Sequence, residues 1–326
     1  MLTEIKLTDM KKIIFTLILA ATALGMQAKT IDLSEKESAN CYMVGRSGSY
    51  SFRADIKGNG VETLGHTATI DLKAAKGVKV IWEDRDIIND SSVKLNGKKI
   101  TFTTGNGFAS GNAVIGLFTD KECTDGNCIW SWHIWLTDAS ECTIEGYTFL
   151  DRNLGAYSTE FGEYGENGCY WQWGRKDPFP ADFSVGITSV PGKKSYAYTS
   201  ANPTIFITRN GRWMDVDAHH AWRKDGMKTM YDPCPPGYCV PIYEDIMVIK
   251  TSGAETGFHK AGAIWYDLDP SGKKMAGRAG YYWTSTTTEG LVSRSNDLYI
   301  YENLTGVKSH YYNASAMSVR PEKIRY

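Results

Sequence analysis

The first half of the chain alternates between apolar and polar positions in short runs, as half-buried β-strands do. Clusters of Gly, Asn, Asp and Lys separate these runs and indicate turns. The runs that we predict as strands cover residues 50–56, 67–72, 78–83, 99–103, 113–118 and 129–136. About seven short strands in roughly 110 residues are typical of a small β-sandwich. We therefore expect an immunoglobulin-like β-sandwich domain over residues 29–140.

The last of these runs, residues 129–136, holds three tryptophans and one histidine. In an extended strand Trp130 and Trp132 share one face, while His133 and Trp135 share the other. We expect the first face to belong to the core, and Trp135 to pack against the neighbouring domain or lie on the surface. The alternative is that His133 and Trp135 form a binding platform.

The second half, residues 141–326, loses this alternation. Its long irregular stretches are rich in Gly, Ser, Thr, Pro and Asn, yet it is dense in tryptophan. Trp171 and Trp173 would share one face of an extended segment, and burial is the commoner fate of such rings. We expect Arg175 and Asp177 to pair near the surface. A helix is predicted over residues 242–250, because an apolar stripe follows a proline there.

Five aromatic, turn-rich blocks follow one another in this half. They are residues 151–156 (DRNLGA), 170–180 (YWQWGRKDPFP), 231–238 (YDPCPPGY), 282–286 (YWTST) and 318–321 (SVRP). In this order they resemble a family of exported proteins of Bacteroides-type bacteria (Bacteroidetes) that carry a so-called major paralogous domain. That domain is related to C-type lectin-like and formylglycine-generating-enzyme folds. The resemblance implies a loop-rich, C-type lectin-like domain over residues 141–326, and hence a mainly β protein with some α+β character.

The N-terminus has the features of a targeting segment. Met10 is followed by two lysines, an apolar run over residues 13–24, and a small residue, Ala28, before a cut. We predict a signal peptide over residues 1–28, with the true start at Met10. The apolar run is shorter than the roughly 20 residues of a membrane span, and the first cysteine, Cys41, lies too far on for a lipid anchor. We expect an exported protein without a membrane span after cleavage, at the cell surface or outside the cell, with the periplasm as the alternative.

The charge of the chain is balanced, and this affects the choice of partners. Lys and Arg number 36 against 37 Asp and Glu, for a net charge of −1. There is no basic tract, which argues against a nucleic-acid partner.

Seven cysteines in an exported chain suggest disulfides and one odd thiol. Cys123 and Cys128 flank one turn sequence, and Cys234 and Cys239 flank another. These two local pairs are the disulfides that we predict. Zinc bound by the same four residues is the alternative, although their wide CxxxxC spacing is a weak zinc signal. The remaining cysteines, Cys41, Cys142 and Cys169, are unassigned, and a pair between Cys142 and Cys169 is also open.

Catalytic and metal signatures are missing from the sequence. No nucleophile elbow, P-loop, dinucleotide fingerprint or HExxH is present, so we expect no catalytic residue and no enzyme activity. The cluster at residues 215–220 is interpreted as a polar loop rather than a metal site. Asn296 and Asp297 differ from the calcium-binding block of sugar-binding C-type lectins, because no Trp precedes them and no Glu-Pro-Asn or Gln-Pro-Asp triplet lies upstream. We therefore expect no cofactor, calcium included.

These observations together favour a non-catalytic binding or adhesion protein, cell-surface or secreted, of which a fimbria-associated component is one form. Its ligand would be a glycan or a host or partner protein, bound at the irregular loops of the second domain. The candidate ligand-binding residues are Trp213, Trp222, Trp265 and Asn296. The alternatives are a structural subunit of a surface polymer and an extracellular hydrolase acting on glycans. The sequence leaves the oligomeric state open.

Overall fold

The structure is a computed structural model, and it describes residues 29–105, 107–160, 162, 165–181, 186–252, 258–267, 273–301 and 304–325. The predicted signal peptide, residues 1–28, lies outside this part of the chain. Strands dominate the described residues, which also hold two α-helices, α2 (Tyr196–Ala201) and α3 (Tyr243–Ser252). The prediction of a mainly β protein is confirmed. No helix in the described residues is long and apolar enough to cross a membrane.

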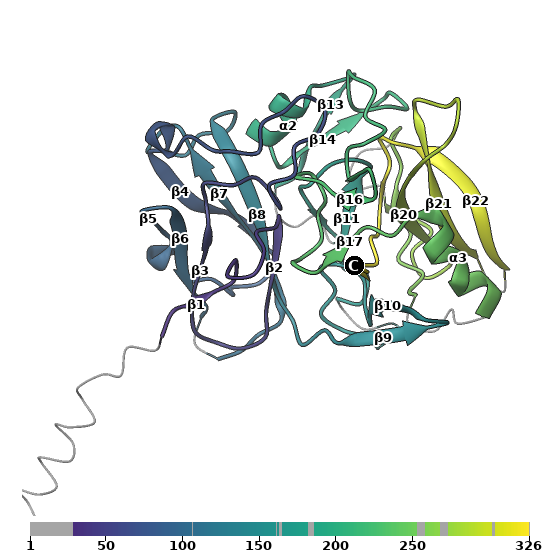
Figure 1. Cartoon of the computed structure of the whole chain (residues 1–326), viewed down its shortest axis with the longest axis horizontal. Coiled ribbons are helices and arrows are strands. Elements are labelled where there is room, and N and C mark those ends of the chain that lie inside the picture. Colours follow the sequence, from purple (N-terminus) through teal and green to yellow (C-terminus); the bar gives the residue numbers. More distant parts are fainter. Residues whose placement is uncertain are drawn as a thin grey trace, which may run out of the picture. The chain divides into compact units, whose positions relative to one another are not determined.

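Two sheets of four strands each make up the first half (Figure 1). One sheet has the order β1 (Ile31–Asp32), β3 (Ser49–Arg53), β6 (Lys99–Thr103), β5 (Lys94–Asn96). The other has the order β2 (Cys41–Val44), β8 (Cys128–Leu136), β7 (Gly111–Phe118), β4 (Gly77–Glu83). Phe52 of the first sheet packs on Tyr42 and Trp132 of the second, with ring centroids 5.1 and 5.3 Å apart. Large aromatic rings therefore fill the space between the two sheets.

The predicted strand at residues 67–72 is wrong. This segment makes only an isolated bridge between Thr69 and Ile56, and its end turns into the 3-10 helix η1 (Leu72–Ala74). The carboxylate of Asp71 accepts a hydrogen bond from the Lys73 backbone N–H, 3.0 Å away. This local cap competes with strand pairing and turns the chain, in the way that Asp side chains do at helix starts.

Strand β8 is buried on both faces, which the alternating pattern alone does not predict. Trp132 lies between the two sheets, and the opposite face, with His133 and Trp135, packs against the second half of the chain. The Trp135 indole donates to the Ala156 carbonyl at 2.9 Å, so the expected packing against the neighbouring half is observed. Burial lowers the pKa of His133 to about 3. His133 is therefore a neutral core residue and not part of a binding platform.

The second half is built from several small sheets. One sheet has the order β17 (Tyr238–Cys239), β24 (Glu322–Lys323), β10 (Tyr147–Leu150), β9 (Glu141–Ile144). A second has the order β12 (Phe179–Pro180), β11 (Cys169–Gln172), β23 (Ala316–Met317), β18 (Ala263–Ile264), β19 (Lys273–Lys274). A third has the order β20 (Ala279–Thr287), β21 (Arg294–Tyr301), β22 (Leu304–Tyr312). Two further pairs are β13 (Thr188–Pro191) with β14 (Ile205–Thr208), and β15 (Arg223–Lys224) with β16 (Met227–Lys228). Helix α3 packs against the sheet of β20, β21 and β22 (Figure 1). Its bounds confirm the predicted helix, and the Tyr243 N–H at its start donates to the Thr286 hydroxyl at 2.9 Å.

Buried indole groups connect the irregular segments of this half. Each of five tryptophans donates its ring N–H to a backbone carbonyl: Trp171 to Lys176, Trp173 to Thr284, Trp213 to Trp173, Trp222 to Arg175 and Trp283 to Trp171. The bonds measure 2.7 to 3.3 Å. Buried carbonyls outside a sheet need such partners. The tryptophans therefore fill the core and also satisfy backbone groups that strands would otherwise pair.

One hydrophobic core crosses the expected domain boundary near residue 140, and residues 31–326 form a single compact unit. Asn40 donates to the carbonyls of Met230 and Asp232, both at 2.8 Å, and so ties strand β2 to the second half. Gly58 has a φ of +51°, and a Cβ there would lie 2.4 Å from the Met230 carbonyl oxygen. Only glycine fits this close approach of two backbones. The division into domains at residues 29–140 and 141–326 stays a prediction.

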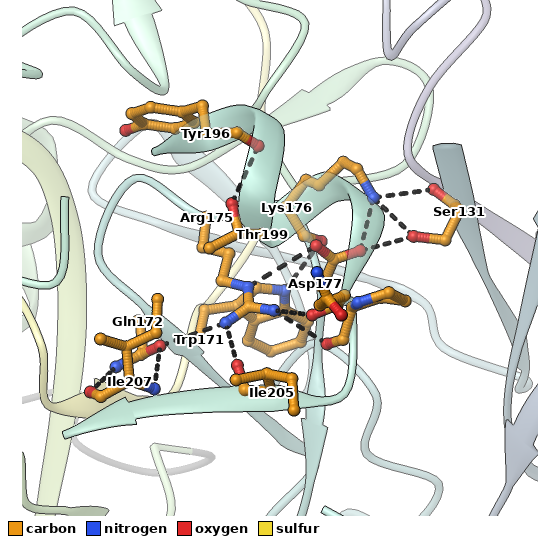
Figure 2. Close-up of polar contacts among 12 residues, drawn as sticks. Ser131, Trp171, Gln172, Arg175, Lys176, Asp177, Tyr196, Thr199, Ile205 and Ile207 are labelled. Atoms are coloured by element: carbon orange, nitrogen blue, oxygen red, sulfur yellow. Dashed lines mark hydrogen bonds and ion pairs between the residues drawn. The ribbon is translucent and has the colours of Figure 1, made fainter. Parts of the chain in front are cut away.

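A network of buried charges lies at this junction (Figure 2). Arg175, Lys176 and Asp177 are 1, 3 and 2% exposed, so the expected pair of Arg175 and Asp177 is present but its expected place near the surface is wrong. The Lys176 ammonium binds the Asp177 carboxylate, and both contact the hydroxyl of Ser131 on β8, at 2.5 and 2.6 Å. Arg175 lies 3.6 Å from the other Asp177 oxygen and donates to the carbonyls of Ile205, Asn202 and Pro203. Two cations thus share one carboxylate out of contact with water.

We predict that Asp177→Asn destabilises the protein by about 3–5 kcal/mol, because two buried cations lose their counter-ion. Urea unfolding measures the change. The control is Asp138→Asn, since the Asp138 side chain is 76% exposed and its partner Arg152 keeps Asp151. An exposed pair contributes about 0–1 kcal/mol. Equal losses in the two variants would contradict the role assigned to Asp177.

Two buried carboxyl groups, Asp245 on α3 and Glu322 on β24, share one arginine, Arg325. Asp245 and Glu322 are 5 and 2% exposed, and one nitrogen of Arg325 lies 2.6 Å from Asp245 and 3.4 Å from Glu322. Burial, with the charge of Asp245 as the next cause, raises the pKa of Glu322 to about 8. The folded protein therefore keeps a proton on Glu322 at pH values where the unfolded chain, with an ordinary Glu pKa near about 4.3, has released it.

Because that pKa is raised on folding, the contribution of Glu322 to stability is complete below about pH 4.3 and is lost as the pH rises towards 8. We predict that Glu322→Gln makes the free energy of unfolding fall less between pH 5 and pH 8 than it does in the parent. Urea unfolding at both pH values tests this, with the exposed Glu289→Gln as the matched control. An unchanged pH dependence in Glu322→Gln would show that another group titrates.

Candidate functional site

An open hollow of about 560 Å³ on the second half is the candidate ligand site, and we call it the aromatic groove. It combines ring faces with a few polar groups, as ligand sites do. Its lining residues are Trp265, Tyr266, Asp267, Arg294, His310, Tyr311, Tyr312 and Ser315.

Three separate segments supply these residues. The first is the turn after β18, the second is the start of β21, and the third is the end of β22 with the turn that follows. Antiparallel pairing of β21 with β22 sets Arg294 opposite Tyr312. The turn after β18 is held in place by the Tyr266 carbonyl, which accepts from the Arg209 backbone N–H at 2.7 Å. Backbone hydrogen bonds therefore hold in place the segments that carry the lining residues.

The rings of the aromatic groove pack against one another. Trp265 and Tyr311 lie 4.9 Å apart between centroids at an angle of 31°, and Tyr281 meets Trp265 edge-on at 5.0 Å. Tyr266 and Tyr312 lie 4.6 Å apart. Trp265 and the three lining tyrosines are partly exposed, whereas Tyr281 beneath them is buried. Rings that are supported from below and open above present stable flat surfaces to a ligand.

Polar groups lie at the edge of these rings. The Arg294 guanidinium carbon is 4.2 Å from the centroid of the Tyr312 ring, and its Nη1 donates to the His310 carbonyl at 3.4 Å. Asp267 is exposed. Burial raises the pKa of Tyr266, and the neighbouring Tyr312 and Asp267 raise it further. The Tyr266 hydroxyl is therefore protonated at neutral pH and available as a donor.

Of the four predicted ligand residues, only Trp265 lines the aromatic groove. The predictions for Trp213 and Trp222 are wrong, because both are 0% exposed and donate their indole N–H groups to carbonyls inside the core. Asn296 is half-buried and lies on β21 opposite His310, but its side-chain oxygen accepts from the Thr288 hydroxyl at 2.8 Å. It flanks the aromatic groove without lining it.

Sequence reasoning missed most of the aromatic groove. Aromatic residues recur at a spacing of two residues in β20 and β21, as in Tyr281 with Trp283 and Tyr299 with Tyr301. This is a strand signal, and it indicates an aromatic sheet face. The contribution of Arg294 depends on strand register, which the chain alone does not reveal.

A second hollow, of about 410 Å³, lies where the two halves meet and is lined by residues that include Lys57, His66, Trp130 and Tyr231. His66 Nδ1 and the Tyr231 hydroxyl are 2.8 Å apart. Burial, followed by the charge of Lys57, lowers the pKa of His66. Trp130 and Tyr231 are only 1 and 4% exposed, so neither offers a ring face to a ligand. The aromatic groove is therefore the stronger candidate.

All seven cysteines lie among the described residues and are free, so the predicted disulfides are wrong. Cys123 has a φ of +52°, and its thiol points to the carbonyls of Asp120 and Lys121. The Cys128 thiol instead contacts the Trp130 carbonyl at 3.3 Å. Burial raises the pKa of Cys128 and of Cys239 to about 12, and it also raises the pKa of Cys234.

The described residues contain no group of three or more His, Cys, Asp or Glu side chains arranged to hold a metal ion. In the segment 215–220, His219 pairs with Asp217 at 3.0 Å, and the His220 carbonyl accepts from the Thr63 hydroxyl. The zinc alternative for the four cysteines gains no support from this arrangement.

No model of a known protein family, no curated protein and no solved structure matches the chain. The site is therefore interpreted from its own geometry.

Trp265 differs from the other tryptophans in exposure, and this can be measured. All ten tryptophans are described, and nine of them are buried while Trp265 is partly exposed. We predict that acrylamide quenches mainly Trp265, so that Trp265→Phe removes most of the readily quenched fluorescence. Trp213→Phe is the control and should leave the quenched fraction unchanged. Retention of that fraction in Trp265→Phe would show that the aromatic groove is closed to small molecules.

Proposed function

We propose that the protein is an exported, non-catalytic binding module that recognises a carbohydrate at the aromatic groove and serves in adhesion. The observation that carries this proposal is the set of partly exposed, mutually supported rings beside Arg294 and Asp267. The negative face of an aromatic ring attracts the C–H groups on one side of a sugar ring. Guanidinium and carboxylate groups at the edge of the rings suit the sugar hydroxyls, because one donates and the other accepts hydrogen bonds.

Binding rather than hydrolysis is favoured by the carboxylates of the site. Glycoside hydrolysis generally uses two carboxyl groups that flank the scissile bond. Asp267 is the single carboxylate among the described lining residues of the aromatic groove. The pair Asp245 and Glu322 is buried and shares Arg325, so it does not face a substrate.

The proposed architecture is an immunoglobulin-like β-sandwich followed by a C-type lectin-like domain. The two four-stranded sheets support the first assignment. Small sheets linked by irregular segments around a tryptophan-rich core support the second, together with the resemblance to exported proteins that carry a major paralogous domain. That resemblance also supports a location at the cell surface or outside the cell.

The test is a glycan array that carries neutral and acidic oligosaccharides, followed by calorimetric titration of the best ligand. We predict that Trp265→Ala and Tyr311→Ala each weaken binding by about tenfold, which corresponds to about 1.4 kcal/mol of lost ring contact. Binding should survive a metal chelator, because calcium takes six to eight oxygen ligands and the described lining of the aromatic groove supplies one carboxylate.

Phe108→Ala is the matched control, since Phe108 is an exposed aromatic residue, 42% accessible, in the first half of the chain. Circular dichroism confirms that each variant is folded. The carbohydrate proposal fails if the protein binds no glycan, if it binds only a protein partner, or if Trp265→Ala binds as tightly as the parent.

A further inference from the structure

Arginines outnumber carboxylates in the aromatic groove and the adjoining loop 209–212, taken over their described residues. The described lining of the groove itself holds one arginine, Arg294, and one carboxylate, Asp267. Two more arginines, Arg209 and Arg212, lie on the adjoining loop. This excess is local, because the whole chain has a net charge of −1.

Arg294 is a cation without a carboxylate counter-ion among the described residues. Its contacts are the ring of Tyr312 and the His310 carbonyl. The buried arginines Arg152 and Arg175 differ from it, because Arg152 binds two carboxylates and Arg175 binds one carboxylate and several carbonyls. A guanidinium has five N–H donors, so Arg294 keeps donors available for a ligand.

The loop 209–212 is attached directly to the aromatic groove. The Arg209 N–H bonds the Tyr266 carbonyl at 2.7 Å, and the Gly211 carbonyl accepts from the Ala314 N–H at 3.2 Å. The Tyr312 ring lies so close to Gly211 that a Cβ there would come within 2.3 Å of it. Arg209 is exposed and Arg212 half-buried, and neither forms an ion pair within the described residues.

From this charge distribution we infer that the ligand of the aromatic groove is an acidic saccharide, carrying carboxylate or sulfate groups, with Arg294 as the residue that binds the acid group. The inference rests on the carbohydrate function proposed above. The guanidinium plane is the side chain best suited to a carboxylate or sulfate, because it can offer two parallel N–H donors. Packing on Tyr312 restrains Arg294 before the ligand arrives, which lowers the ordering cost of binding. Arg209 and Arg212 add long-range attraction that salt screens.

The experiment compares each acid with a neutral partner of the same size. Tetragalacturonate and its methyl ester test the carboxylate, and a sulfated galactose tetrasaccharide and its desulfated form test the sulfate. Calorimetric titration of the full-length exported protein with all four probes gives the affinities. We expect at least one acidic probe to bind about tenfold more tightly than its neutral partner, with an affinity that falls as NaCl rises from 0.05 to 0.5 M. The pair that shows the preference identifies the acid group.

Variants then assign the preference to particular residues. Arg294→Gln should reduce the preference for the acid to less than about threefold while binding of the neutral probe changes little. The double variant Arg209→Gln with Arg212→Gln should mainly weaken the salt dependence. The matched control is Arg46→Gln, which removes the same charge from an exposed site in the first half and should change neither quantity.

The outcomes separate the proposed carbohydrate function from the recognition of an acid group by Arg294. If neutral probes bind as tightly as their acids, or if Arg294→Gln keeps the full preference, acid recognition by Arg294 is wrong and the carbohydrate function stands. If none of the four probes binds and the glycan array is also blank, both proposals fail. If the array selects neutral glycans alone, only the inference about acid groups is overturned.

Discussion

The rest of the structure depends on how the chain binds one buried carboxylate, that of Asp177. Lys176, Arg175 and the Ser131 hydroxyl surround this carboxylate, and they come from both halves of the molecule. Ser131 lies on β8 of the first half, whereas Arg175 donates to the carbonyls of the segment that follows α2. Removing three charges from water costs several kcal/mol for each ion. This cost is offset only while all the partners stay in place, so the network strongly favours one arrangement of the two halves.

The tryptophan indoles extend this constraint through the second half. The Trp171 and Trp222 N–H groups bind the carbonyls of Lys176 and Arg175, on the same short segment that holds the charges. Trp283 in turn binds the Trp171 carbonyl, and Trp283 lies on β20, the strand that pairs with β21. A chain of hydrogen bonds and strand pairing therefore runs from the buried charges to the sheet that carries Arg294. Aromatic side chains therefore hold loops that lack regular strand pairing, and the partly exposed rings of the aromatic groove pack on this framework.

Local features of the fold could be predicted from the sequence, and features that depend on distant partners could not. Strand β8 and helix α3 were predictable because each pattern lies within one short segment, of 9 and 10 residues. The strand predicted at residues 67–72 failed because Asp71 caps a turn there. The segments around Trp213 and Trp222 resemble the segment around Trp265 in composition. The burial of Trp213 and Trp222 depends instead on carbonyl groups about 40 residues away or more, which accept their indole N–H groups. The aromatic groove combines three segments through the register of β21 and β22, and a register is not visible in a single sequence.

The continuous core has a consequence for how this protein unfolds. Because side chains from residues 39 to 319 belong to one cluster, neither half can lose its packing without exposing the other. We therefore expect melting to be one cooperative transition shared by both halves, because each half on its own would expose the apolar face of β8 or the surface that covers it. A destabilising substitution in the first half would consequently affect the aromatic groove through the fraction of molecules that remain folded, rather than through any change in the geometry of the groove.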